Sequence, residues 1–253
     1  MKAKYYVALM GATVALMMIV APLRASAVTD EQIVSSIKDS YVFKIFLKGD
    51  DIKVKSQNGV VTLTGVVAGS ARKLLAETTA TVMPGVKKVD NRLTVKGEEP
   101  TANSDAWIKD KVETTLALHR SVNDSKIEVS VKDGVVTLTG IAASQAKKEL
   151  ATAYAEDVEG VKDVKNKMTV DGSFKATYNM AADYIDDASI TAQVKFALLS
   201  HRSTSALKTN VETTNGVVTL SGKAKNRAEK TLATLLANDI NGVQAVVNQM
   251  TIE

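Results

Sequence analysis

The feature that most constrains this chain is a motif that occurs three times. An Asn-Gly or Asp-Gly pair opens the strings NGVVTLTG, DGVVTLTG and NGVVTLSG, whose first glycines are Gly59, Gly134 and Gly216. A second glycine follows each of them after 26 residues and opens GVKKVDNRLTV, GVKDVKNKMTV or GVQAVVNQMTI. The spacing within a copy is constant, whereas the copies lie 75 and then 82 residues apart. This pattern predicts three fixed modules joined by linkers of different length.

Each module is expected to begin with a helix. An Asp precedes an apolar stripe with steps of three and four residues, which places the apolar side chains on one helix face. The Asp is predicted to be the helix N-cap, because its side chain can accept a hydrogen bond from a free backbone N–H. The residues are Asp30, Ile33, Ile37 and Tyr41; Asp105, Ile108, Val112 and Leu116; and Asp187, Ile190, Val194 and Leu198.

A β-hairpin is predicted after each first helix, with turns at 58–59, 133–134 and 215–216. Asn-Gly and Asp-Gly favour type I′ turns, which require positive φ at both central residues, so Gly59, Gly134 and Gly216 are interpreted as structural turn glycines. The turn predicts the pairs Val54–Leu63 and Ser56–Val61 across the first hairpin. One sheet face is then apolar and the other lies in water.

A second, Ala- and Leu-rich helix and a last alternating strand complete each module. The predicted fold class is therefore α+β, with three tandem α-β-β-α-β modules, each a three-stranded sheet with two helices on one face. Modules this small have thin cores, so neighbouring modules are expected to touch. Asn91, Asn166 and Asn248 lie in phase with the apolar residues of the last strand. They are interpreted as structural amides bonded to backbone, with a threefold polar ligand site as the alternative.

The first 27 residues have the three parts of a secretory signal. Lys2 and Lys4 precede an apolar run over 5–23, and Ala25-Ser26-Ala27 is an A-x-A cleavage pattern. Cleavage after Ala27 is predicted; an uncleaved membrane anchor is the alternative, because the run approaches the length that spans a bilayer. The predicted domains are a signal peptide over 1–27 and modules over 28–97, 104–172 and 183–253. The chain has no cysteine, which excludes disulfides and thiolate sites, and the periplasm is the expected location.

The two linkers differ in composition. The first, 97–104, is polar and contains a Pro, as is typical of a spacer. The second, 171–184, holds Phe174, Tyr178, Met180 and Tyr184. These side chains are expected to pack on a module or to form a short docking helix, with a strip that binds a partner as the alternative.

Charge and motifs limit the function classes. Without residues 1–27, Lys and Arg fall from 32 to 29 against 28 Asp and Glu, so the net charge falls from +4 to +1. A nearly neutral chain gives no general case for nucleic-acid binding. No phosphate-binding glycine pattern and no Ser-His-Asp arrangement is present, so no catalytic residue, cofactor or metal site is assigned. His119 and His201 are interpreted as cations at helix ends, and a metal site shared between two modules is the remote alternative.

The repeated motifs resemble the BON domain. The resemblance rests on the order α-β-β-α-β, on G-V-V-x-L-x-G in the hairpin and on G-V-x-x-V-x-N-x-[LM]-T-[VI] at the end, and it covers nearly all of the chain after residue 27. The osmotically inducible periplasmic type of this family usually has two such domains, whereas three are expected here. The resemblance implies a non-enzymatic role in the cell envelope: binding phospholipid surfaces, protection in osmotic stress, or chaperoning of exported proteins.

Two functions from different classes remain open at this point. One is a module that binds a membrane phospholipid surface; the other is a chaperone-like module that binds exported client proteins. A lipid contact is predicted at Trp107 with Lys109 and Lys111, because an exposed Trp beside Lys suits a membrane interface. Gln32 and Ser189 occupy the position of Trp107 in the other modules, which indicates a wet position. The alternative is that Trp107 packs against a neighbouring module.

Overall fold

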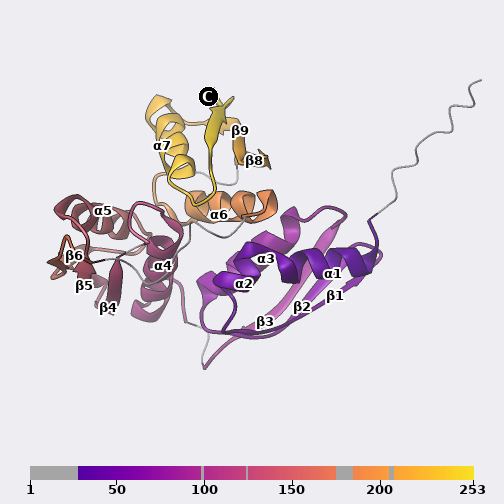
Figure 1. The fold of residues 1–253 in the computed structure, drawn as a ribbon, viewed down its shortest axis with the longest axis horizontal. Helices are drawn as coiled ribbons and strands as arrows, with labels where there is room; N and C mark the ends of the chain where they lie inside the picture. Colours follow the sequence, from indigo (N-terminus) through magenta and orange to yellow (C-terminus); the bar gives the residue numbers. More distant parts are fainter. Residues whose placement is uncertain (1–27, 98–99, 124, 175–184, 205–207) are drawn as a thin grey trace, which may run out of the picture.

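The computed structural model describes residues 28–97, 100–123, 125–174, 185–204 and 208–253. The predicted signal segment and cleavage site lie outside these residues, as do Tyr178, Met180 and Tyr184 of the second linker. Within the described part the chain forms three separate sheets, one in each module (Figure 1). The predicted α+β fold with three repeated modules is confirmed.

Each module repeats one order of elements. Module one contains α1 (Asp30–Asp39), α2 (Tyr41–Ile45), β1 (Asp51–Gln57), β2 (Val60–Val67), α3 (Ser70–Val82) and β3 (Lys88–Val95). Module two contains α4 (Asp105–Leu118), β4 (Lys126–Lys132), β5 (Val135–Ala142), α5 (Gln145–Glu156), β6 (Asp163–Asn166) and β7 (Thr169–Val170). Module three contains α6 (Asp187–Ser200), β8 (Thr209–Thr214), β9 (Val217–Ala224), α7 (Arg227–Asn238), β10 (Ala245–Asn248) and β11 (Thr251–Ile252).

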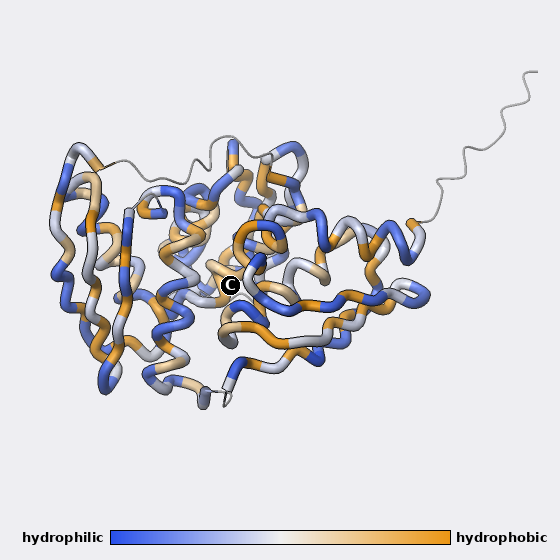
Figure 2. Tube along the Cα trace, turned by 60° about the horizontal axis from the view of Figure 1, so that its bottom comes forward, coloured by the Kyte–Doolittle hydropathy of each residue, from blue (hydrophilic) through white to orange (hydrophobic). Residues whose placement is uncertain are grey.

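The second strand of each module is central. It pairs antiparallel with the first strand and parallel with the last, so the second helix crosses over between parallel strands. The predicted pairs Val54–Leu63 and Ser56–Val61 are confirmed. Asn58 and Gly59 have φ of 54° and 79°, and the two other turns are alike, as a type I′ turn requires. Along the strands apolar and polar residues alternate (Figure 2), which leaves one sheet face in water.

Two details differ from the predicted pattern. The first helix of module one breaks at Ser40, where an extended backbone (ψ 149°) ends α1 and the hydroxyl caps α2. In modules two and three the last strand is interrupted, but both of its pieces pair with the same central strand. Each sheet therefore still has three rows of strands.

The predicted N-caps are wrong by one residue. Thr29, Ser104 and Asp186 cap the first helices, and the regularly placed Asp serves another purpose. Each Asp lies in the first helical turn, and its carboxylate accepts both N–H groups of the hairpin turn in its own module. In module two, Asp105 accepts the N–H groups of Asp133 and Gly134, each at 2.8 Å. The Asp thus ties the start of the first helix to the hairpin turn.

The three in-phase Asn side chains are structural, as predicted. The Asn166 amide donates to the Lys148 carbonyl and to the Thr152 hydroxyl, both at 2.8 Å, and its oxygen accepts the Met168 N–H at 3.0 Å. Asn248 repeats these bonds with the corresponding partners in module three. Asn91 donates to the Lys73 carbonyl and the Glu77 carboxylate in module one. In each module this amide fastens the last strand to the middle of the second helix.

The expectation that the modules touch is confirmed, and helix α6 carries most of the contact. It lies between module one and the rest of module three (Figure 1), and α3 packs along it. Residues on all sides of α6 are buried, including the polar Ser189 and Gln193. As a result, the apolar cores of modules one and three join into one cluster, whereas module two keeps a core of its own. In the described residues, no helix has the length and apolar character to cross a membrane.

Candidate functional site

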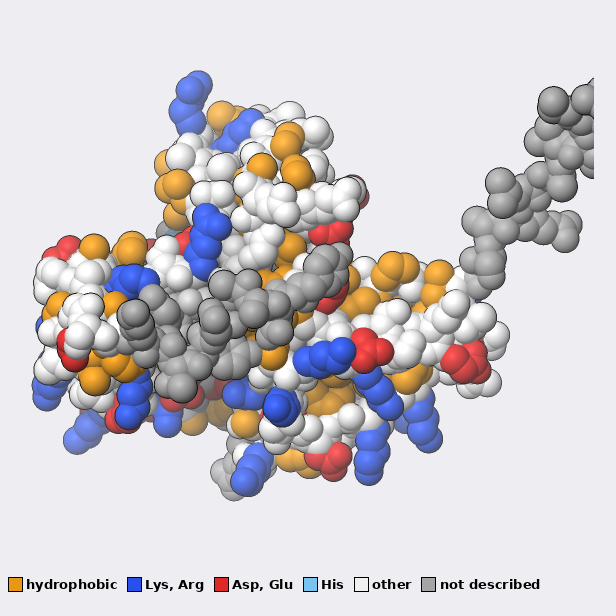
Figure 3. All heavy atoms as spheres, in the orientation of Figure 1, with side chains coloured by type: hydrophobic (Ala, Val, Ile, Leu, Met, Phe, Trp, Pro, Cys, Tyr) orange, Lys and Arg blue, Asp and Glu red, His pale blue; other side chains and the backbone are white. Residues whose placement is uncertain are grey.

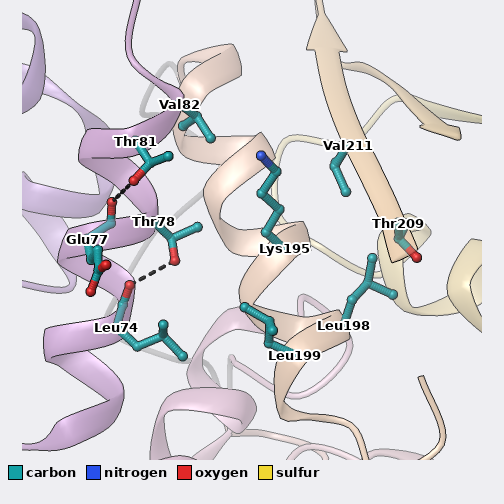
Figure 4. Close-up of a pocket in the computed structure, with 10 residues that line it drawn as sticks. All are labelled: Leu74, Glu77, Thr78, Thr81, Val82, Lys195, Leu198, Leu199, Thr209 and Val211. Carbon is teal, nitrogen blue, oxygen red and sulfur yellow. Dashed lines mark hydrogen bonds between the residues drawn. The ribbon is translucent and has the colours of Figure 1, made fainter. Parts of the chain in front are cut away.

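A groove with mainly apolar walls lies between modules one and three (Figure 4). Helix α3 forms one wall, and α6 with the start of β8 forms the other. Its volume is about 330 Å³, which lies at the lower end of the range for small-molecule sites. The lining residues are Leu74, Glu77, Thr78, Thr81, Val82, Lys195, Leu198, Leu199, Thr209 and Val211.

Most polar groups of this groove are already engaged. The hydroxyls of Thr78 and Thr81 donate to helix carbonyls at 2.8 Å, and Glu77 accepts the amide of Asn91. Lys195 differs, because among the described residues no carboxylate lies within ion-pair distance of its ammonium group. Burial lowers the pKa of Lys195, against the opposing effect of the Glu212 carboxylate. The groove therefore combines apolar walls with one partly desolvated cation.

Module two has a second groove at the corresponding place, but its chemistry differs. There Glu113 stands at the position of Lys195 and Ala117 at that of Leu199, and Arg72 of module one faces them. Burial raises the pKa of Glu113, with the nearby Lys109 acting in the opposite direction. The groove of module two thus carries both signs of charge and less apolar surface, so the groove between modules one and three is the better site for an apolar ligand.

The two histidines join modules two and three. His119 Nδ1 lies 3.2 Å from Asp239 Oδ2, and His201 Nε2 lies 3.1 Å from Asp157 Oδ2. Each His ends the first helix of its module, and each Asp ends the second helix of the other module. The backbone repeats the exchange, since the Arg120 N–H donates to the Asp239 carbonyl and the Arg202 N–H to the Asp157 carbonyl. The interface therefore has approximate twofold symmetry.

The half of this interface around Asp239 is the more extensive. Ser121 and Tyr154 donate to its carboxylate, and the Tyr154 ring stacks on His119 with centroids 4.0 Å apart. Burial by itself raises the pKa of Asp239, but the donors His119, Ser121 and Tyr154 outweigh it, so the pKa is lowered. Burial and the bond to Asp239 raise the pKa of Tyr154. Both shifts favour a neutral Tyr154 phenol beside an ionised Asp239 carboxylate.

Both histidines lie at the C-terminal end of a first helix, as interpreted, but the surroundings of His201 disfavour its charged form. Its burial lowers its pKa, and this effect outweighs the nearby Asp157. Both histidines border a cavity of only about 10 Å³, which has room for a single water molecule. No group of three or more metal-ligating side chains occurs within the described ranges. These histidines hold two modules together.

The three residues predicted to contact lipid, Trp107, Lys109 and Lys111, all lie on α4. Trp107 is half-buried and packs against the core of module two. The Lys111 ammonium lies 3.9 Å from the centroid of its ring, and the same lysine is buried and faces Glu159. Lys109 is exposed beside Glu113. The expectation of a wet position is wrong for Ser189, which is fully buried and accepts the Val42 N–H of module one.

Asp110 makes a contact between modules that the sequence analysis did not find. Helix α3 has no side-chain cap of its own, because Gly69 occupies its N-cap position. Asp110 of module two supplies the missing acceptor, taking the Ala71 N–H at 2.5 Å and the Ser70 hydroxyl at 3.3 Å. One signal was present: the corresponding caps in modules two and three are Ser144 and Asn226, so Gly69 marks a helix start that needs a partner.

Comparisons with known proteins agree with this repeated architecture. A model of the BON domain matches residues 29–97, 104–172 and 186–253. Osmotically-inducible protein Y of Escherichia coli K12 is 31% identical over 203 residues, which cover 79% of this chain and 96% of that protein. Outer membrane lipoprotein DolP of Haemophilus influenzae is 29% identical over 148 residues, which cover 58% of this chain and 74% of that protein.

A similarity to solved structures is much weaker. The C-terminal domain of CdsD, a structural protein of the type III secretion system of Chlamydia trachomatis, covers 87% of this chain and 97% of its own, with 15% identity and a TM-score of 0.24. A score this low carries no argument about the present chain.

Proposed function

Because the chain belongs to the BON domain family and contains three such domains, we propose that it is a non-enzymatic periplasmic protein of the cell envelope that binds phospholipid. The observation that carries this proposal is the groove of Figure 4, with its apolar walls and its single cation. An acyl chain suits the walls, since its transfer from water to an apolar surface is favourable. A lipid phosphate suits Lys195, whose ammonium then gains a partner that the described residues do not provide.

The location rests on two independent supports. Residues 1–27 carry the three parts of an export signal, with cleavage proposed after Ala27. One relative is named as an outer membrane lipoprotein and another as an osmotically inducible protein. Both names fit a role at the envelope under osmotic stress. The amino-terminal sequence of the mature protein tests this part, and a chain that still begins at Met1 in the membrane fraction contradicts it.

The non-enzymatic part rests on membership of the BON domain family and on the surroundings of the groups with shifted pKa between modules two and three. Lys195 and Glu113, whose pKa values are also shifted, line the two grooves described above. Such groups often mark active sites. Here Asp239, Tyr154 and His201 lie in the interface between modules two and three, around a cavity with room for about one water molecule. Their shifts are explained by burial and by one another. They are proposed to stabilise the assembly of modules, with no substrate beside them.

The test is co-sedimentation with vesicles of phosphatidylcholine, with and without phosphatidylglycerol. Leu199→Asp places a charge on the groove wall and is expected to weaken binding at least tenfold, about 1.4 kcal/mol. Leu150→Asp is the matched control, because both leucines are 39% exposed on a helix and Leu150 lies on α5, away from the groove. Unchanged binding by Leu199→Asp, or an equal loss in both variants, rules out the groove as the lipid site.

The predicted contact at Trp107, Lys109 and Lys111 has a separate readout. Trp107 is the only tryptophan, so its fluorescence reports this place alone. A blue shift on addition of vesicles supports lipid contact there. An unshifted spectrum, together with unchanged binding by Trp107→Ala, leaves Trp107 with a packing role.

A chaperone-like function is the second candidate, and the same groove favours it. The apolar walls of this groove also suit the apolar side chains of an unfolded exported protein. Reduced, carboxymethylated lactalbumin serves as a permanently unfolded probe. If the protein binds this probe and no vesicle, and Leu199→Asp abolishes the binding, the chaperone-like function replaces the lipid function.

A further inference from the structure

We propose that the outer surface of module three docks the protein on an anionic phospholipid bilayer. This α7 surface consists of Lys223, Lys225, Arg227, Leu235 and Ile252. The inference rests on the proposed phospholipid function and adds to it the place and the lipid charge.

The apolar part of the α7 surface is unusually exposed. Leu235 on α7 is 61% exposed and Ile252 on β11 is 48% exposed, the two highest values among the large apolar side chains of the described residues. Both line one open hollow, together with Arg227 and Lys230. Exposed apolar side chains rimmed by cations are typical of surfaces that enter the headgroup region of a membrane.

The charge of the α7 surface is positive. Lys223 and Lys225 are exposed. Lys223 pairs with Thr251 across β9 and β11, and both lysines lower the pKa of Glu253. Glu253 is already paired with Lys208. The other nearby acid, Glu229, is buried and accepts the backbone N–H of Lys225. Lys208, Lys223 and Lys225 thus lie around the carboxylate of Glu253, and the surface keeps an excess of positive charge.

A comparison of the three modules shows that these cations are not required by the fold. Lys223, Lys225 and Arg227 lie in and just after the second strand of module three. The same hairpin forms in the other modules with neutral residues at these positions, which are Val66, Ala68 and Ser70 in module one and Ile141, Ala143 and Gln145 in module two. Leu235 likewise stands where module two has Ala153 and module one has Thr78. The cations and the exposed Leu are additions to module three alone.

The position of the α7 surface leaves it free to meet a membrane. The end of the chain lies on the lobe of module three farthest from module one (Figure 1), and basic and apolar side chains are visible on this lobe (Figure 3). The C-terminal end of α7, at Asp239, contacts module two. Lys208 directly precedes Thr209, which lines the groove of Figure 4. An anionic bilayer attracts each basic residue near its surface.

The test measures partition onto vesicles of phosphatidylcholine with about 30% phosphatidylglycerol. The triple variant Lys223→Gln, Lys225→Gln, Arg227→Gln removes three positive charges, and Gln already stands at the position of Arg227 in module two. The control variant Lys53→Gln, Lys55→Gln, Lys88→Gln removes the same charge from exposed positions in module one. We expect at least a tenfold loss of partition for the first variant and less than a twofold loss for the second, about 1.4 and 0.4 kcal/mol.

A spectroscopic arm locates the contact directly. In a Trp107→Phe background, the tryptophan introduced by Leu235→Trp is expected to shift its emission to the blue with anionic vesicles and to stay unshifted with pure phosphatidylcholine. If the wild-type protein binds no vesicle, the proposed function fails and this inference fails with it. Suppose instead that the wild-type protein binds vesicles. The α7 surface is then excluded if the two triple variants lose partition equally, or if the emission of the Leu235→Trp variant does not shift. The groove remains under test through Leu199→Asp.

Discussion

At the scale of single residues, the most instructive feature is the Asp that opens each module. A position one residue earlier would make it an ordinary helix cap. In the first turn, its two carboxylate oxygens reach two N–H groups of the hairpin turn, as Asp105 does with Asp133 and Gly134. Those N–H groups belong to the turn and lie outside the paired residues of β4 and β5, so they can donate to the carboxylate. One carboxylate thus links three elements of a module.

The contribution of this contact can be measured with Asp105→Asn. An amide offers one acceptor oxygen where the carboxylate offers two, so one turn N–H loses a charged partner. We expect a loss of about 1–2 kcal/mol in the free energy of unfolding. Urea denaturation followed by circular dichroism measures it. Asp163→Asn, at an exposed position in the same module, should change the free energy of unfolding by no more than about 0.5 kcal/mol; equal effects of the two changes would contradict this account.

A pH dependence is expected from His201. Its pKa in the folded protein lies below the ordinary value of 6.5, chiefly because it is buried. The unfolded chain therefore binds the proton more readily, so His201 contributes its full stability above the ordinary pKa and loses it as the pH falls toward the folded pKa. Unfolding in urea at about pH 7.5 and about pH 5.5 should show a smaller difference in His201→Gln than in the wild type. Equal differences in both proteins would exclude this role.

At the scale of elements, the start of helix α3 shows why one glycine is needed. Gly69 has extended backbone angles that any residue adopts, so conformation does not require it. Space does, because a Cβ at this position would overlap the Asp110 carboxylate. Modules two and three use a side chain at the same place to cap their own helix. In module one the cap comes from a neighbouring module, and the glycine leaves room for it.

The close contact between Gly69 and Asp110 predicts the behaviour of Gly69→Ser. A serine there would cap α3 but would collide with Asp110 and push modules one and two apart. We expect the single variant to be destabilised by about 1–3 kcal/mol. In Asp110→Ala the same serine has room and replaces the lost cap, so Gly69→Ser should then be neutral or stabilising. A double-mutant cycle of urea midpoints measures the change of sign, and additive effects would refute the contact.

At the scale of the whole molecule, the three modules are held by contacts of different kinds. Modules one and three share an apolar core along α6. Modules two and three exchange polar ends of helices, with His119 facing Asp239 and His201 facing Asp157. The two halves of this exchange correspond residue by residue but differ in burial. The Asp239 side chain is 13% exposed, and that of Asp157 is 46% exposed.

The difference in burial predicts unequal effects of two matched substitutions. Asp239→Ala leaves the donors Ser121 and Tyr154 without their acceptor, and we expect a loss of about 3 kcal/mol. Asp157→Ala removes a more exposed carboxylate, so its loss should be about 1 kcal/mol or less. Thermal unfolding of both variants near neutral pH provides the comparison. Similar losses for the two would mean that burial does not set the strength of this interface.

The interior of each module could be predicted from the amino-acid sequence, because that interior depends on local chemistry. Turn residues such as Asn58 and Gly59 specify the hairpin and its register, and the apolar stripes specify which helix face meets the sheet. Contacts between modules join residues far apart in the chain and leave no periodic signal, so they became visible in the three-dimensional structure alone. It showed that Ser189 is buried against module one, that Asp110 caps a helix in another module, and that Lys195 faces an apolar groove. The sequence pattern around a polar residue is the same whether water or a neighbouring module covers that residue.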